Sequence, residues 1–132
     1  MHSLKLRISY ADTDQMGMVY YANYLIFFER GRTEFLRDIG LEYKAIEDRG
    51  FYFPVIHAEC KSLAPAKYGD VIEIETKISE ITAASITCYY EVKCKGKLLV
   101  TGKTKHPFVN KDLKPVRFPK DIREALEKNL EK

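Results

Sequence analysis

The sequence has 132 residues, of which 45% are hydrophobic and 31% are charged, with a formal net charge of +3. This length and composition predict a single folded domain over residues 1–132 and exclude a disordered chain. The charge is too small and too scattered to indicate a nucleic-acid partner. Because no N-terminal leader and no apolar run of about 18 residues is present, we expect no membrane span and a cytoplasmic location.

The first predicted element is a half-buried strand over residues 4–10, where apolar and polar side chains alternate. A loop over residues 11–22 follows, with two carboxylates, Asp12 and Asp14, and a glycine at Gly17. Asn23 is the expected N-cap of a helix. A carboxylate just before a helix N-terminus has a chemical use, because unpaired helix amides can polarise the carbonyl oxygen of a substrate.

A long helix is predicted to follow the N-cap Asn23 and to stop at Gly40, which suits the C′ position. Its buried face is expected to consist of residues at helical spacing, namely Tyr24, Phe27, Phe28, Gly31 and Phe35. Such an aromatic face needs a broad cover. Gly31 costs ~1 kcal/mol relative to alanine in a helix interior, and we expect it to let a sheet backbone approach closely.

The hydrophobic period then changes to two, which predicts strands. After a charged connection over residues 41–50 that can hold a short helix, strands are expected at 51–63, 71–81, 85–94 and 98–109. Lys95-Gly96 predicts a two-residue hairpin between the last two, and a charged helix over residues 121–132 ends the chain.

Consecutive strands on short turns pair antiparallel, and a single apolar helix covers one sheet face. The expected fold class is therefore α+β, with a five-stranded antiparallel sheet wrapped around one long central helix and a short C-terminal helix. One sheet face and an edge strand remain poorly covered, which predicts a homo-oligomer.

The cysteines and histidines indicate no metal or redox site, and we expect no cofactor. Cys88 and Cys94 lie about 20 Å apart on one strand, too far for a disulfide, so reduced thiols are expected. His57 and Cys60 point to opposite strand faces, which spoils a metal site. His106 is expected at the surface, at a strand end.

The stretch before the helix carries a specific motif: Asp-Thr-Asp, two residues, Gly, one residue, Val-Tyr-Tyr, one residue, Asn-Tyr, with Glu29 and Arg32 further along. Secondary matches occur at Pro54, Pro65-Ala66, Tyr68-Gly69-Asp70 and residues 114–119. Over nearly its whole length the chain resembles the hotdog-fold acyl-CoA thioesterases. It is most similar to the 4-hydroxybenzoyl-CoA thioesterase family and its Tol–Pal-associated subgroup.

This resemblance implies that Asp14 is the catalytic carboxylate and that the backbone amide of Tyr21 polarises the thioester carbonyl. Gly17, Val19, Tyr20 and Tyr24 are the corresponding candidates for binding an acyl-CoA or acyl-carrier-protein substrate. The resemblance further implies a site completed at a subunit interface, in a dimer or tetramer. Some members hold the CoA phosphates with a basic cluster before the fourth strand, but here residues 82–85 contain no basic residue.

Several alternatives stay open at the level of sequence. Turn or cap chemistry explains Asp12 and Asp14 without catalysis, and Asp12 is the more structural of the two. The tyrosines can belong to the core. Glu29 and Arg32, three residues apart on the helix, are consistent with a structural salt bridge, the favoured interpretation, or with a pair that supports the active-site residues.

The chemistry itself also leaves a choice. A thioester needs no metal, so Asp14 can attack the carbonyl directly or take a proton from an attacking water. A non-catalytic acyl-thioester binding module on the same fold is the main rival function. A dehydratase is a weaker one, because it needs a histidine beside the acid and none lies between residues 3 and 56.

Overall fold

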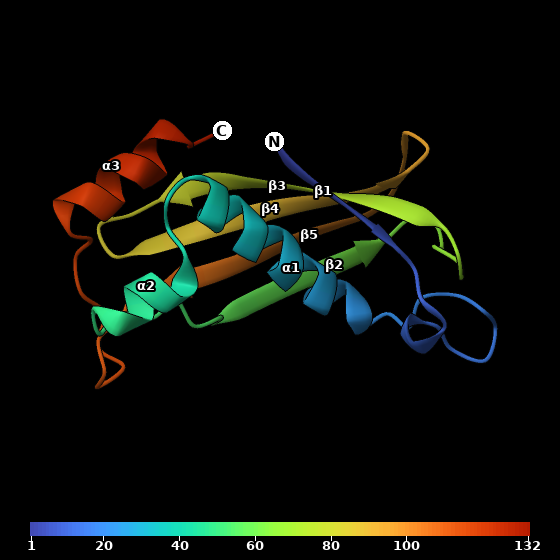
Figure 1. Cartoon of the computed structure of the whole chain (residues 1–132), viewed down its shortest axis with the longest axis horizontal. Coiled ribbons are helices and arrows are strands. Elements are labelled where there is room, and N and C mark those ends of the chain that lie inside the picture. The colour runs from blue at the N-terminus through green and yellow to red at the C-terminus, as the bar shows by residue number, and fades with distance from the viewer.

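Five strands pair into one antiparallel sheet, and a 16-residue helix lies across one of its faces (Figure 1). The computed structural model describes all residues from 1 to 132. In chain order the elements are β1 (His2–Arg7), the 3₁₀ turn η1 (Tyr10–Asp12), α1 (Asn23–Asp38), α2 (Tyr43–Asp48), β2 (His57–Ser62), β3 (Val71–Ile81), β4 (Ser85–Cys94), β5 (Lys97–Pro107) and α3 (Lys120–Lys128). The expected α+β class with a five-stranded antiparallel sheet is confirmed.

The strand order, β1-β3-β4-β5-β2, differs from simple pairing of consecutive strands. β3, β4 and β5 do pair in sequence, and the positive φ angles of Lys95 (51°) and Gly96 (79°) form the expected hairpin turn. β2, however, pairs with β5 at the far edge and not with β3. Residues 63–70 are too long a connection for a tight hairpin, and they carry the chain from the edge strand β2 past β5 and β4 to β3, which lies next to the opposite edge strand β1.

Two predicted strands are shorter than expected. β1 ends at Arg7, because Asp12 Oδ2 accepts hydrogen bonds from the N–H and hydroxyl of Ser9, both at 2.9 Å, and turns the chain into η1. Tyr10 is consequently 81% exposed. β2 begins only at His57. The residues before it leave the sheet, because Phe51 and Phe53 pack on the ring of Phe108, with centroids 4.8 and 5.1 Å away.

The predicted apolar face of α1 is confirmed at all five positions, and Arg32 and Leu36 are buried with it. Asn23 was expected to be the N-cap, but it is the first helical residue. Its side-chain amide donates to the carbonyl of Asp12 at 2.8 Å. At the other end Gly40 has a φ of 87°, and Leu41 N–H donates to the carbonyl of Leu36 at 2.7 Å. This is the expected glycine stop.

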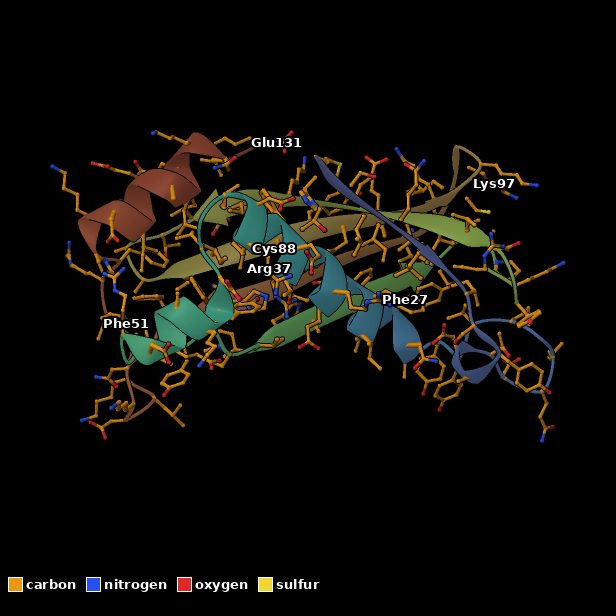
Figure 2. The ribbon with its side chains drawn as sticks, viewed as in Figure 1. Phe27, Arg37, Phe51, Cys88, Lys97 and Glu131 are labelled. Atoms are coloured by element: carbon orange, nitrogen blue, oxygen red, sulfur yellow. The ribbon has the colours of Figure 1, made fainter.

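Two glycines allow α1 to lie very close to the sheet. A Cβ at Gly31 would come within 2.7 Å of Thr76 Oγ1 and 2.8 Å of an Ile74 methyl group. The sheet therefore approaches this glycine with β3 side chains, and not with its backbone as expected. On β5, a Cβ at Gly102 would overlap the ring of Phe28. That ring also stacks on Tyr90, with centroids 4.5 Å apart. Aromatic rings and small residues thus interlock between the two layers. Figure 2 shows the side chains on the ribbon, with Phe27 labelled on α1.

The opposite sheet face carries half-exposed polar residues, including Lys93, which pairs with Glu75 at 3.2 Å and Glu91 at 3.7 Å. β2 is exposed at every residue and leaves one edge of the sheet unpaired. At the other end α3 buries Ile122 and Leu126. None of the helices is both long and apolar enough to cross a membrane.

Gly102→Ala is predicted to lower the free energy of unfolding by about 2 kcal/mol, as overpacking of a filled core does. Urea unfolding followed by circular dichroism measures it. In the double variant Gly102→Ala/Phe28→Leu, the smaller side chain makes room for the new methyl group. The double variant should therefore lose less stability than the sum of the two single variants, and strict additivity would contradict the proposed overlap.

Candidate active site

The loop between η1 and α1 is a short hairpin held against the segment before β3. Thr13 pairs with Val19 across the hairpin, and Met18 pairs with Lys67. The N–H of Val19 donates to the carbonyl of Ala66 at 2.9 Å. Gly17 has a φ of 76°, which a non-glycine residue rarely adopts, and nothing lies within 4 Å of its missing Cβ. The turn conformation, and not close packing within the chain, explains this glycine.

Asp14 lies at the exposed start of this hairpin, with one carboxylate oxygen positioned and the other free. Its Oδ1 accepts hydrogen bonds from the N–H groups of Met16 at 2.8 Å and Met18 at 3.3 Å. Its Oδ2 accepts no hydrogen bond from the protein. The backbone therefore orients the carboxylate while leaving one oxygen available for chemistry.

Asp12 is committed to the local structure. Its carboxylate caps Ser9, and its carbonyl accepts from Tyr20 N–H at 3.0 Å and from the Asn23 side chain at 2.8 Å. These contacts tie η1 to the beginning of α1. They fit the structural reading of Asp12.

The amides that precede α1 include two without an acceptor. The N–H groups of Asn23, Tyr24 and Leu25 each donate to the carbonyl three residues earlier. Those of Tyr21 and Ala22 donate to no protein oxygen. Tyr21 is 72% exposed, and its N–H has no acceptor within the chain, which is what an oxyanion donor requires.

The predicted substrate-binding residues separate into two groups. Tyr20 and Tyr21 are exposed, and their rings pack together at 4.9 Å. Val19 and Tyr24 belong to the hydrophobic core, and burial raises the pKa of the Tyr24 phenol. Their side chains pack into the core and so anchor the loop and the start of the helix.

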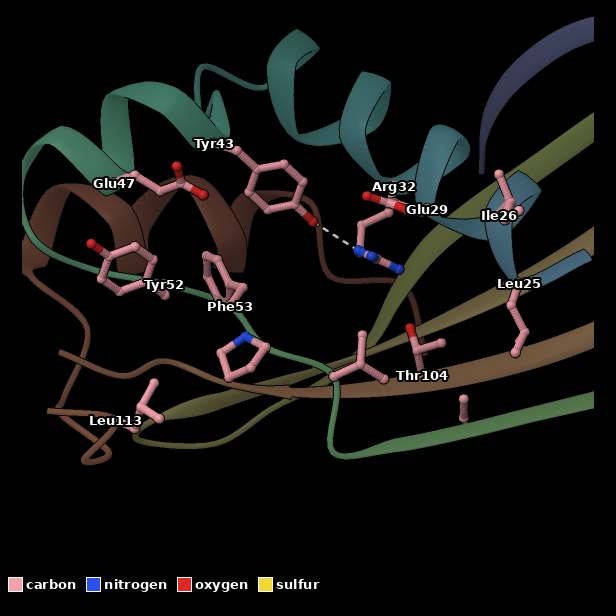
Figure 3. A pocket seen from close by; sticks show the side chains of 13 residues that line it. Leu25, Ile26, Glu29, Arg32, Tyr43, Glu47, Tyr52, Phe53, Thr104 and Leu113 are labelled. Carbon is pink, nitrogen blue, oxygen red and sulfur yellow. Dashed lines mark hydrogen bonds between the residues drawn. The ribbon is translucent and has the colours of Figure 1, made fainter. Parts of the chain in front are cut away.

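A pocket of about 720 Å³ opens along the flank of α1 (Figure 3). It begins at Leu25 and Ile26 in the first turns of the helix and continues between α1, α2 and the segment leading into β2. Its apolar lining includes Tyr52, Phe53, Val55 and Leu113. Sequence reasoning missed this pocket, because its lining combines segments between residues 25 and 58 with Thr104 and Leu113, and none of them has a pocket-specific pattern.

Arg32 projects into this pocket from α1 and is only 6% exposed. It forms no salt bridge with Glu29, so the predicted i,i+3 ion pair is wrong. Its Nε donates to the Tyr43 hydroxyl at 2.7 Å and its Nη1 to the Tyr90 hydroxyl at 2.9 Å. Both partners come from other elements, which is why spacing within the helix could not reveal them.

The hydrogen bonds continue from Arg32 across the sheet to His106. The Tyr90 and Thr104 hydroxyls lie 2.6 Å apart, and Thr104 Oγ1 lies 2.7 Å from His106 Nε2. His106 Nδ1 is 3.4 Å from the carbonyl of Phe53. The carbonyl can only accept, so Nδ1 carries the proton and Nε2 accepts from Thr104. The chain of donors therefore runs in one direction, from the guanidinium to the imidazole.

His106 is fully buried, so its expected surface position is wrong. Burial, reinforced by the positive charge of Arg32, lowers the pKa of the imidazole to about 4. The side chain is neutral at physiological pH. Alternation along β5 places it on the core face, and only the pairing of β5 with its neighbours reveals that this face is covered.

The three cysteines are free thiols, as expected. Cys60 is exposed, Cys94 is half-buried, and burial raises the pKa of Cys88 to about 11. His57 pairs with Glu59 at 2.7 Å. No group of three or more histidine, cysteine or acidic side chains is arranged to hold a metal ion.

Residues 82–85, which lack a basic side chain, have two arginines beside them. Arg117 and Arg123 border a hollow that also includes Thr82, and Arg123 donates to the Thr82 carbonyl at 3.2 Å. Positive charge therefore reaches this turn from the C-terminal part of the chain.

Comparison with known proteins places these features in context. A family model described as the thioesterase-like superfamily matches residues 8–126. The chain is 34% identical over 124 residues to the putative acyl-CoA thioesterase YneP of Bacillus subtilis, covering 91% of this chain and 90% of that protein. It is 35% identical over 128 residues to the acyl-CoA thioesterase YbgC of Haemophilus influenzae, covering 94% and 93%.

A solved structure is also very similar. The crystal structure of a hypothetical protein, TT1821 from Thermus thermophilus, matches with a TM-score of 0.94 and 34% identity, covering 98% of this chain and 99% of that one. The similarity thus includes the loop, α1 and every segment that lines the pocket.

The buried neutral state of His106 predicts a specific pH dependence of stability. Its pKa is near 6.5 in the unfolded chain and about 4 in the folded protein. Between these values the unfolded state binds the extra proton, so stability falls as the pH falls. From pH 7 to pH 5 the wild type should lose about 2 kcal/mol through this group.

Urea unfolding of the wild type and of His106→Gln at both pH values measures this contribution. The neutral glutamine removes the titrating group, so the variant should lose about 2 kcal/mol less than the wild type over the same interval. Equal losses in the two proteins would show that His106 is not held neutral by the fold.

Proposed function

The chain belongs to the thioesterase-like superfamily and is an acyl-CoA thioesterase, and we propose that Asp14 is its catalytic carboxylate. The observation that carries this proposal is that one loop holds both an oriented carboxylate and an unpaired backbone amide. Backbone amides hold Oδ1 of Asp14 and leave Oδ2 free, and the Tyr21 amide at the other end of the loop has no acceptor. A base or nucleophile and an oxyanion donor therefore sit on the same short segment.

In the proposed reaction the thioester carbonyl oxygen accepts a hydrogen bond from the Tyr21 N–H. In one route, Asp14 takes a proton from water as the water oxygen bonds to the carbonyl carbon. In the other, the Asp14 oxygen attacks that carbon, and water then hydrolyses the resulting anhydride. In both routes the carbon–sulfur bond breaks, and the products are a carboxylic acid and a thiol. One oxyanion donor typically contributes ~3 kcal/mol to such a step.

The remaining predicted residues fit supporting roles in this proposal. Gly17 closes the turn that presents two amides to Asp14. Tyr20 and Tyr21 are exposed next to the free amide, while Val19 and Tyr24 anchor the loop and the helix in the core. A binding module without turnover is the rival function, and the names of the relatives favour hydrolysis.

A second copy of the chain is part of the proposal. The mouth of the pocket is flanked by exposed apolar side chains, Leu25 and Ile26 on α1 and Val55 and Ile56 before β2. The β2 edge beside them is unpaired. Exposed apolar surface next to an open strand edge favours association. We propose a homodimer or tetramer in which the partner closes the pocket.

Finer assignments follow from the family resemblance. We propose the hotdog arrangement, with the sheet wrapped around α1, and membership in the Tol–Pal-associated subgroup. Either coenzyme A or an acyl-carrier protein can present the thioester, and the cytoplasm is the proposed location.

Asp14→Asn is predicted to lower kcat by at least 100-fold, because the amide can neither accept the proton nor attack the carbonyl. Release of free thiol from a panel of short, long and aromatic acyl-CoAs measures the effect. The matched variant Asp12→Asn keeps an acceptor oxygen for Ser9 and should retain most of the activity. Circular dichroism and melting temperature verify that both variants fold, and substantial turnover by Asp14→Asn would refute the assignment.

Ile26→Asp is predicted to weaken self-association at least tenfold and to lower kcat/KM with it, because an unpaired charge buried in an apolar interface costs several kcal/mol. Light scattering should give a multiple of 15.3 kDa for the wild type. Val71→Asp, at a comparably exposed position on β3 away from the pocket, is the control and should keep the wild-type mass. A fully active wild-type monomer would contradict the shared site.

A further inference from the structure

Arg32 is the buried charged group of the pocket, and no carboxylate of the chain forms an ion pair with it. Its two hydrogen-bond partners are the hydroxyls of Tyr43 and Tyr90. Burial raises the pKa of both tyrosines, so both remain neutral at physiological pH. The guanidinium of Arg32 stays positively charged at physiological pH. A buried cation held only by neutral partners is costly and is normally compensated by an anion.

The geometry leaves donors available for such an anion. Of the five N–H groups of Arg32, those on Nε and one on Nη1 are occupied, while Nη2 donates to no protein acceptor. The side chain borders the pocket between Tyr43 and Thr104 (Figure 3). The free donors thus face a space otherwise lined mostly by apolar side chains.

The position of Arg32 relates this charge to the proposed reaction. The pocket-lining residues Leu25, Ile26, Glu29 and Arg32 follow one flank of α1. At the rise of an α-helix, Arg32 lies about 14 Å along the axis from Asn23. The pocket therefore begins in the first turn of α1, four residues after Tyr21, and the guanidinium lies further along the same flank. Such a pocket can hold an acyl chain and place its far end next to a positive charge.

We propose that the pocket accepts acyl groups with a carboxylate at the end remote from the thioester, and that Arg32 binds this carboxylate. The inference rests on the proposed thioesterase function and names its substrate class, thioesters of dicarboxylic acids. A carboxylate supplies both the missing negative charge and two acceptor oxygens in the planar geometry that guanidinium N–H groups match. A hydroxyl at the same position would supply an acceptor but leave the charge uncompensated.

Two carboxylates of the chain line the same pocket and do not take this place. Glu29 and Glu47 are both exposed, and neither forms an ion pair or a hydrogen bond with Arg32. They lie on the solvent side, where water screens their charge. Glu29 therefore provides a control, since it is close to Arg32 on the same helix and has the opposite charge.

The wild-type enzyme gives the primary test. Its kcat/KM is compared for adipoyl- and hexanoyl-CoA, suberoyl- and octanoyl-CoA, and sebacoyl- and decanoyl-CoA. In at least one pair the carboxylate-ended chain should be hydrolysed at least tenfold more efficiently, as expected for a charge-assisted hydrogen bond made only by that chain. Preference for the methyl-ended chain in all three pairs, or for 8-hydroxyoctanoyl-CoA over suberoyl-CoA, overturns the proposal.

Substitutions assign the preference to Arg32. Arg32→Met should abolish it or reverse it in favour of the methyl-ended chain, whereas Glu29→Gln should keep or increase it. If Arg32→Met retains the wild-type preference, Arg32 does not bind the carboxylate. If this variant does not fold, the wild-type comparison and Glu29→Gln still decide between the outcomes.

Ligand binding without turnover separates this inference from the proposed function. Octanoate should raise the melting temperature of the wild type more than octanol does, and Arg32→Met should lose the difference. If octanoate binds in this way but no acyl-CoA is hydrolysed, the thioesterase assignment fails and the anion site stands. If acyl-CoAs are hydrolysed with no carboxylate preference and octanoate has no advantage over octanol, the anion site fails alone.

Discussion

The close contact between α1 and the sheet, made possible by Gly31 and Gly102, determines where every functional group lies. Because the sheet contacts the helix through the Phe28 ring and through Thr76 and Ile74, α1 can neither rotate nor slide without overlap. Its first turn is therefore fixed next to the Asp14 loop, and Arg32 is fixed on the side facing Tyr90. One flank of the helix remains without a cover from the chain itself, and this flank becomes the wall of the pocket.

The polar groups beneath α1 form a second constraint that depends on the first. Helix packing buries Arg32, and the hydroxyls of Tyr90 and Thr104 carry its hydrogen bonding to a neutral His106. Each group in this series donates a hydrogen bond to the next, so removing the hydroxyl of Tyr90 or Thr104 would leave a buried donor or acceptor unpaired. The series satisfies hydrogen-bonding capacity but supplies no negative charge. The positive charge of Arg32 therefore remains uncompensated at the pocket, where the guanidinium also has N–H groups without an acceptor.

The sequence was most informative where a pattern depends on neighbours along the chain. The alternation in β3 and β4, the hairpin at Lys95-Gly96 and the aromatic face of α1 are local features, and the structure agrees with each. The position of β2 was not accessible in this way, because nothing local states whether a strand pairs with β3 or β5. Arg32 and His106 were misjudged for the same reason: their partners lie far away in the sequence, on strands and on α2. The Asp14 motif was recognised by resemblance, while its hydrogen bonds to Met16 and Met18 required coordinates.

The proposed site pairs the Asp14 carboxylate, in the loop before α1, with the Arg32 guanidinium, in the pocket along α1, so that the distance between the two groups selects the acyl chain. In the proposed reaction, Asp14 and the Tyr21 amide set where the thioester carbon lies, and Arg32 binds the distal anion. Arg32 lies about 14 Å from Asn23 along the axis of a rigid helix. An acyl chain gains the second interaction only when its length matches this span, because the core contacts of α1 prevent the two ends from adjusting. Selectivity in such a site arises from a distance fixed by helix packing. In this proposal, residues that never touch the substrate, above all the two glycines, contribute to which substrate is accepted.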